Sequence, residues 1–182
     1  MSEPVIERLS WQTVPKWPAV VSVALTVVLG VLIALNVMQF DKQTLERAAE
    51  VVLLQTFLVA AGRYWLERHA IWGWGMGMAV ILFCRELHFV GTSIGVYLGF
   101  GLLMLWFARR YPEWSKDYRL RPSLGFLVAA LSTYAVSFTI DQRWWRGMPF
   151  EAEIHTRLEE TLEVCAHSMV GLAVATLSRR RK

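Results

Sequence analysis

The sequence predicts an all-α fold: an integral membrane helical bundle with six transmembrane helices, forming one transmembrane domain over residues 1–182. Three observations predict it. Apolar residues make up 55% of the chain and are gathered into runs. Several runs approach the roughly 20 residues that a helix needs to cross a bilayer core about 30 Å thick. The charged residues, 19% of the total, lie mainly between the runs.

The first span is expected at about 18–40, where the sequence carries no charge from Ala19 to Phe40. We expect it to remain as a permanent anchor. A cleaved signal peptide has a basic start and a shorter apolar stretch, whereas this leading segment contains Glu3 and Glu7. The other spans are expected at about 48–66, 70–87, 89–108, 123–140 and 160–178.

The third span is short and rich in glycine, so the chain could cross five times instead of six. One helix over residues 71–108 would be about 57 Å long at 1.5 Å per residue, too long for a single crossing. The chain must therefore turn near residues 85–93. Tryptophans gather near the expected span ends, Trp72 and Trp74 among them, where interfacial anchors are common.

Lys and Arg predict the orientation, because short cytoplasmic loops collect them. With six spans and both termini in the cytoplasm, the inner segments hold about twice as many Lys and Arg as the outer segments. We therefore expect a bacterial inner (plasma) membrane protein with both termini cytoplasmic. Orientation explains the net charge of +4, so nucleic acid is not an expected partner. The expected partners are the lipid bilayer and either further copies of the chain or another membrane protein.

Polar residues in or beside the spans are expected to converge at the outer face. Glu160, Glu163 and His167 are spaced three and four apart, which puts them on one stripe of the last helix. Ionisable residues within spans are candidates for function, since each is costly to place in lipid. The full candidate cluster is Glu50, Arg85, Glu86, His88, Asp141, Glu160, Glu163 and His167.

Three interpretations of this cluster remain open. Its arginines could pair with its carboxylates in a purely structural network. Alternatively, carboxylates and imidazoles from facing helices resemble half of a di-metal site built inside a helix bundle, which would take a divalent transition metal. A proton or solute path is the third interpretation. The candidate metal ligands are Glu86, His88, Glu163 and His167.

Two fragments resemble motifs of small uncharacterised bacterial multi-pass inner-membrane proteins. Arg85-Glu86-Leu87-His88 resembles an Arg-Glu-Leu-Asp/His motif at the outer end of a span. Residues 159–163, Glu-Glu-Thr-Leu-Glu, resemble a Glu-Glu-x-x-Glu start of the final helix. The resemblance implies that these polar residues act as a unit, and it implies no particular activity.

The expected function is therefore that of a multi-pass inner-membrane protein of unknown activity, an accessory or scaffold subunit with a polar Glu/His/Arg cluster at its outer face. One alternative is a metal-dependent hydrolase or oxidoreductase acting at that face. Another is a small proton-coupled permease. The sequence leaves open whether the chain is an enzyme. It lacks a Walker loop, a Gly-x-Ser-x-Gly elbow and a His-Glu-x-x-His motif, which argues against nucleotide-driven chemistry and zincin-type proteolysis.

Overall fold

The structure is a computed structural model that describes residues 17–35, 37, 41–87, 92–147 and 151–180. The prediction of an all-α chain is confirmed, because helices account for nearly all of the secondary structure in these ranges. Two short strands of two residues each complete it. The elements are α1 (Trp17–Ala34), α2 (Lys42–Glu67), α3 (Ala70–Glu86), α4 (Thr92–Asp117), β1 (Tyr118–Arg119), α5 (Arg121–Asp141), α6 (Glu151–Ala175) and β2 (Ser178–Arg179).

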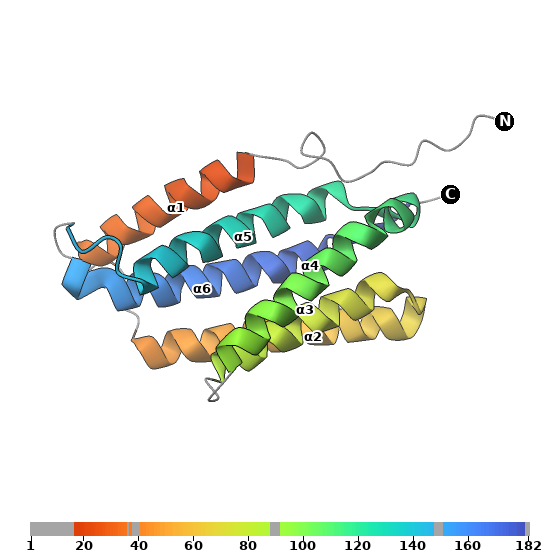
Figure 1. The fold of residues 1–182 in the computed structure, drawn as a ribbon, viewed down its shortest axis with the longest axis horizontal. Coiled ribbons are helices and arrows are strands. Elements are labelled where there is room, and N and C mark those ends of the chain that lie inside the picture. Colours follow the sequence, from red (N-terminus) through yellow and green to blue (C-terminus); the bar gives the residue numbers. More distant parts are fainter. Residues whose placement is uncertain (1–16, 36, 38–40, 88–91, 148–150, 181–182) are drawn as a thin grey trace.

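The helices run up and down side by side, so every turn lies at one of two ends of the bundle (Figure 1). We call these the Arg85 end, where α3 and α5 finish and α2 and α6 begin, and the Glu67 end, where α2 finishes and α3 begins. The pair α5–α6 packs together along its length, and α2 packs against both α3 and α6. The remaining long helix, α4, packs mainly on α3 and crosses the bundle obliquely.

A turn of two residues joins α2 to α3. Arg68 takes a left-handed conformation (φ 51°) and its backbone N–H donates to the Tyr64 carbonyl, which ends α2. His69 then caps α3 by accepting a hydrogen bond from the backbone N–H of Ile71. Further along α3, a Cβ on Gly75 would lie 3.3 Å from both Ala60 and Val174. The absent side chain lets α2, α3 and α6 approach closely.

The larger apolar core lies between α2, α3, α4, α5 and α6 and is rich in aromatic rings. Trp72 and Trp74 are almost fully buried there, so they are core residues and not the interfacial anchors that the sequence suggested. Trp74 packs against Phe107 and donates its indole N–H to the Leu103 carbonyl at 3.1 Å. A smaller cluster joins α1 to α5 and α6 through Leu29, Ile33, Ile140, Leu158 and Leu162.

Two segments expected as polar loops are partly helical. The segment after residue 108 continues α4 through Pro112 to Asp117, supported by an ion pair between Arg110 and Glu113 one turn apart. The last helix begins at Glu151, well before the expected residue 160. A short antiparallel pairing that the sequence analysis did not predict joins the two strands, with Tyr118 opposite Arg179.

Among the described residues, α5 is the helix both long enough and apolar enough to cross a membrane by itself. This helix alone does not establish a membrane protein, since the core helix of a water-soluble bundle meets the same criterion. Charged residues within α2, α4 and α6 lower the hydropathy of those helices.

Candidate functional site

The candidate site lies inside the bundle at the Arg85 end, where three helices meet. Arg85 and Glu86 occupy the last turn of α3. Glu163 and His167 lie four residues apart on α6, so they face the same way. Because α6 packs along α5 and touches α3, these side chains meet in the interior.

Arg85 and Glu163 form an ion pair between α3 and α6. The guanidinium Nη2 donates to the Glu163 carboxylate, which also accepts a hydrogen bond of 3.3 Å from the Ser137 hydroxyl on α5. Glu163 is 8% exposed. The Arg85 guanidinium also lies over the Tyr134 ring, 5.8 Å from its centre. A carboxylate buried in this way needs such partners, because burial without them would be strongly unfavourable.

His167 is fully buried and links α3 to α5. Its Nε2 lies 2.9 Å from the Glu86 carboxylate, whose side chain is only 4% exposed. Its Nδ1 is hydrogen-bonded to the Tyr134 hydroxyl. The result is a continuous chain of hydrogen bonds from Tyr134 through His167 to Glu86.

The order of groups in this chain determines what it can do. An ionised carboxylate only accepts hydrogen bonds, so with Glu86 ionised the Nε2 of His167 carries the proton. In the neutral imidazole, Nδ1 then accepts from the Tyr134 hydroxyl; this tautomer is inferred from the bonding pattern. An acid, an imidazole and a hydroxyl in this order can pass a proton from one end of the chain to the other.

The structure brings together four of the residues that the sequence suggested: Arg85, Glu86, Glu163 and His167. Glu160 lies on the same helix but pairs with Lys42 of α2 at 3.2 Å, outside this group. Asp141 is exposed at the end of α5 and accepts a hydrogen bond from its neighbour Gln142. Glu50 is half-buried on α2 and makes no hydrogen bond or ion pair with the four residues. His88 lies outside the described residues.

Sequence reasoning missed Tyr134 as a member of the site. Two other hydroxyls on α5 do not bond His167: Ser137 donates to Glu163, and Thr133 donates to the Ala129 carbonyl. A signal was available, because Tyr134 lies in the middle of an apolar span, where a hydroxyl needs a partner. Tyr134 and Ser137 are also three residues apart and share a helix face.

Among the described residues, the donor groups at this site do not form a set of metal ligands. In the part of the chain that the structure describes, no three His, Cys, Asp or Glu side chains converge. Both ring nitrogens of His167 are engaged by protein groups. The Glu163 carboxylate is neutralised by Arg85. Of the three suggested metal ligands that the structure describes, Glu86 and His167 touch, and they do so as a direct hydrogen bond.

Several charged groups at the rim of the Arg85 end have shifted pKa values, Lys42 and Glu159 among them. The hydrogen bond to Glu160 raises the pKa of Lys42, and the charge of Glu160 acts in the same direction. Burial raises the pKa of Glu159 from 4.5 to about 7, and the neighbouring negative charges of Glu163 and Asp141 add to this shift. Glu159 therefore titrates near neutral pH at the rim of the Arg85 end.

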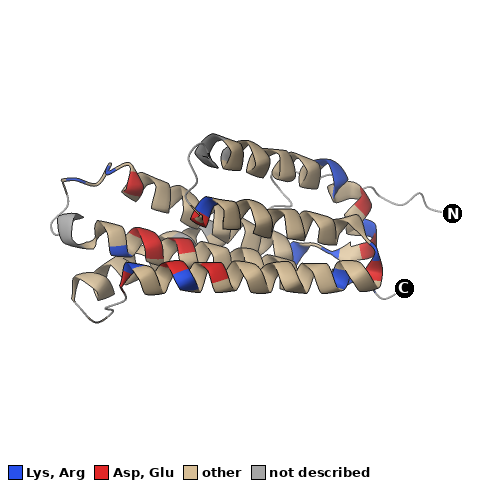
Figure 2. Ribbon diagram, turned by 90° about the horizontal axis from the view of Figure 1, so that it is seen from below, with Lys and Arg blue, Asp and Glu red and all other residues tan. Residues whose placement is uncertain are grey.

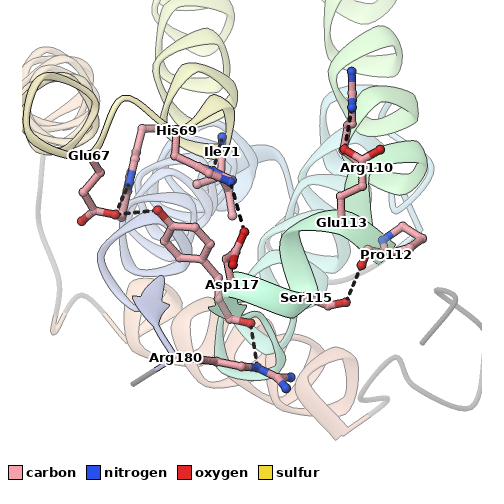
Figure 3. A network of polar contacts seen from close by, with 11 residues as sticks. Glu67, His69, Ile71, Arg110, Pro112, Glu113, Ser115, Asp117 and Arg180 are labelled. Carbon is pink, nitrogen blue, oxygen red and sulfur yellow. Dashed lines mark hydrogen bonds and ion pairs between the residues drawn. The ribbon is translucent and has the colours of Figure 1, made fainter. Parts of the chain in front are cut away.

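A second polar network, centred on Glu67, lies at the opposite end (Figure 3). The Glu67 carboxylate accepts hydrogen bonds from the Tyr118 hydroxyl (2.5 Å) and the Trp72 indole (3.0 Å), and it pairs with Arg63. Burial favours the neutral acid, yet the hydrogen bonds from Tyr118 and Trp72 lower the pKa of Glu67. This network ties the turn between α2 and α3 to the corner between α4 and α5.

The chain matches no protein-family model, no curated protein and no solved structure. Its function must therefore be argued from the geometry of its own residues.

Proposed function

We propose that the chain is a multi-pass membrane protein of a bacterial-type inner membrane, with all six helices crossing the bilayer. The observation that carries this proposal is a set of apolar stripes on outward faces. Exposed side chains recur at helical spacing on three helices, and each is about half exposed or more. They are Val20, Val23, Val27 and Val31 on α1; Val51, Leu54 and Leu58 on α2; and Leu98, Leu102 and Leu105 on α4.

A water-soluble bundle would carry polar residues on these stripes, since large contiguous apolar patches are rare on soluble monomers. The charges support the same proposal, because they gather toward the two ends of the bundle and leave the middle largely free of them (Figure 2). Helices of 17–26 residues are about 25–39 Å long, which matches the thickness of a bilayer core.

In this proposal the Glu67 end faces the cytoplasm, because more Lys and Arg lie there, and both termini are cytoplasmic. The test uses single cysteines in a chain whose Cys84 and Cys165 are changed to serine. Arg68→Cys lies in the α2–α3 turn, and the matched Gln142→Cys follows α5 at the other end. In intact cells an impermeant thiol reagent should label only the second. Labelling of both from one side would exclude the six-span arrangement.

The role that the site supports best is that of an accessory or scaffold subunit, through contacts with further copies of itself or with another membrane protein. Arg85 neutralises Glu163, and Glu86 pairs with His167, so these polar groups join three helices. They leave no set of metal ligands among the described residues. Such a network fixes the positions of α3, α5 and α6 relative to one another. Metal analysis of the purified protein should find no stoichiometric transition metal. Finding one would favour the metal-dependent enzyme instead.

A second candidate is a small proton-coupled permease, which the chain from Tyr134 through His167 to Glu86 favours. In proteoliposomes under a pH gradient, a permease would show proton flux that His167→Ala abolishes. The Ser132→Ala variant is a matched control on α5, because Ser132 bonds only its own helix in the structure. A proton flux equal to that of empty liposomes would exclude the permease and favour the scaffold role.

A further inference from the structure

A groove of about 430 Å³ opens beside the polar network, between α3, α4 and α5. It exists because α4 packs on α3 but diverges from α5 toward the Arg85 end (Figure 1). Most of its lining is apolar, with Leu82, Phe100, Leu131 and Phe138 among the residues. Its volume falls within the range of roughly 300–1,000 Å³ that is usual for small-molecule sites.

Arg85 is the one charged residue that lines this groove. Its partner Glu163 lies on the α6 side of the guanidinium, and Glu163, Glu86 and His167 are not among the lining residues. About a third of the Arg85 side chain is exposed. A guanidinium has five N–H donors, and only Nη2 bonds Glu163. The groove therefore presents the open edge of an ion-paired guanidinium, with spare donors, and no carboxylate.

The groove also has a direction. Arg85 is at the end of α3, while Leu131 and Phe100 lie farther toward the middle of the bundle. The axial distance from Leu131 to Phe138 on α5 is about 10 Å at 1.5 Å per residue. A ligand that fits would have a polar head at the bundle end and an apolar tail pointing toward the middle.

We propose that this groove binds one long-chain fatty acid, with the carboxylate on Arg85, the first part of the acyl chain along α4 and α5, and the rest of the chain in the adjacent lipid. The inference rests on the proposed membrane bundle, which gives the groove a lateral opening to lipid. Moving a chain from lipid into an apolar groove brings no hydrophobic gain. Selectivity must therefore come from the charged head, and planar guanidinium groups suit carboxylates.

The test is photolabelling of the full chain in phosphatidylcholine nanodiscs with a diazirine-bearing long-chain fatty acid. Labelled peptides should map to α3, α4 or α5, and palmitate should compete while hexadecanol, which has no charge, should not. Arg85→Gln should weaken competition by palmitate roughly tenfold or more. The matched control Arg47→Gln removes an exposed cation at the same end and should change nothing.

A second variant keeps the test decisive if Arg85→Gln does not fold. Ala135 lines the groove on α5 and belongs to neither polar network, so Ala135→Phe should fill the groove and abolish labelling. Unchanged labelling of that variant, or equal competition by hexadecanol, would overturn the proposal. So would equal competition by a phosphatidylglycerol, since the occupant would then be a phospholipid. Each of these failures leaves the cysteine-labelling pattern intact, and so is distinct from failure of the proposed topology.

Discussion

The two ends of the bundle use similar residue types to solve different problems. At the Arg85 end, charge meets charge in the interior, and Glu163 and His167 have almost no contact with solvent. At the Glu67 end, a carboxylate about 15% exposed shares three donors, of which two are neutral ring systems. This difference predicts two sizes of effect on the free energy of unfolding. Loss of one partner should lower it more at the Arg85 end, where the remaining group stays charged and buried. The loss should be smaller at the Glu67 end, where other donors or water can replace the missing partner.

The largest expected effect comes from breaking the ion pair between α3 and α6. Glu163→Ala leaves the Arg85 guanidinium without its carboxylate, so the free energy of unfolding should fall by about 3–5 kcal/mol. Reversible unfolding in detergent measures this loss of stability. In an Arg85→Ala background the same change should cost much less. Additive losses across this double-mutant cycle would contradict the pairing.

A smaller loss is expected from the other half of the same network. Tyr134→Phe removes the hydroxyl that bonds His167 Nδ1 and leaves a buried ring nitrogen unsatisfied, at a cost of about 1–3 kcal/mol. The matched variant Tyr64→Phe changes a partly exposed tyrosine of α2. It should be close to neutral in the same unfolding assay. Equal effects of the two variants would show that the hydrogen-bonded chain does not form.

The two ends should also respond oppositely to pH. The pKa of Glu159 is raised to about 7, so the folded state holds its proton more tightly than the unfolded chain. That contribution to stability is present below pH 4.5 and is lost as the pH rises toward 7. Glu67 has a lowered pKa, so its contribution is present above about 4.5 and is lost as the pH falls.

The free energy of unfolding, measured between pH 3 and 8, checks these two opposite dependences on pH. Glu159→Gln should remove the loss of stability on the alkaline side, and Glu67→Gln should remove the loss on the acid side. If one substitution flattened both slopes, the two networks would not be independent.

The smallest effects are expected at the Glu67 end. Tyr118→Phe removes one of three donors to Glu67, so the loss should be about 1 kcal/mol. Arg63→Gln breaks an exposed pair with Glu67 one turn away and should cost about 0.3–0.5 kcal/mol. A loss at Tyr118 as large as that at Glu163 would remove the contrast between the two ends.

The sequence predicted the helical bundle and the convergence of Arg85, Glu86, Glu163 and His167, since ionisable groups beside apolar runs must find partners. It could not assign the pairs. Whether Glu160 or Glu163 meets Arg85 depends on how α6 is rotated and how far it slides along α3. The rotation and the sliding are set by packing at positions such as Gly75, where three helices meet. The order of residues along the chain does not show which helices meet at such a position.

The elements that were missed have a similar explanation. The expected span ended at residue 108, but local ion pairing and packing of Tyr111 and Trp114 keep α4 helical to Asp117. The burial of Trp72 and Trp74 was missed because tryptophan suits both an interface and a core. Strands of two residues carry no periodicity to detect.

The pairing of β1 with β2 constrains the order in which the chain can assemble. The two strands are separated in sequence by α5 and α6, and Arg180 adds a bond of 2.7 Å from its backbone N–H to the Asp117 carbonyl. During synthesis this strand pairing cannot form until both helices have been made. Its contacts are remote in sequence, so they form late and carry the entropy cost of closing a long loop. The corner after α4 is therefore completed only after residues 178–180 have been made.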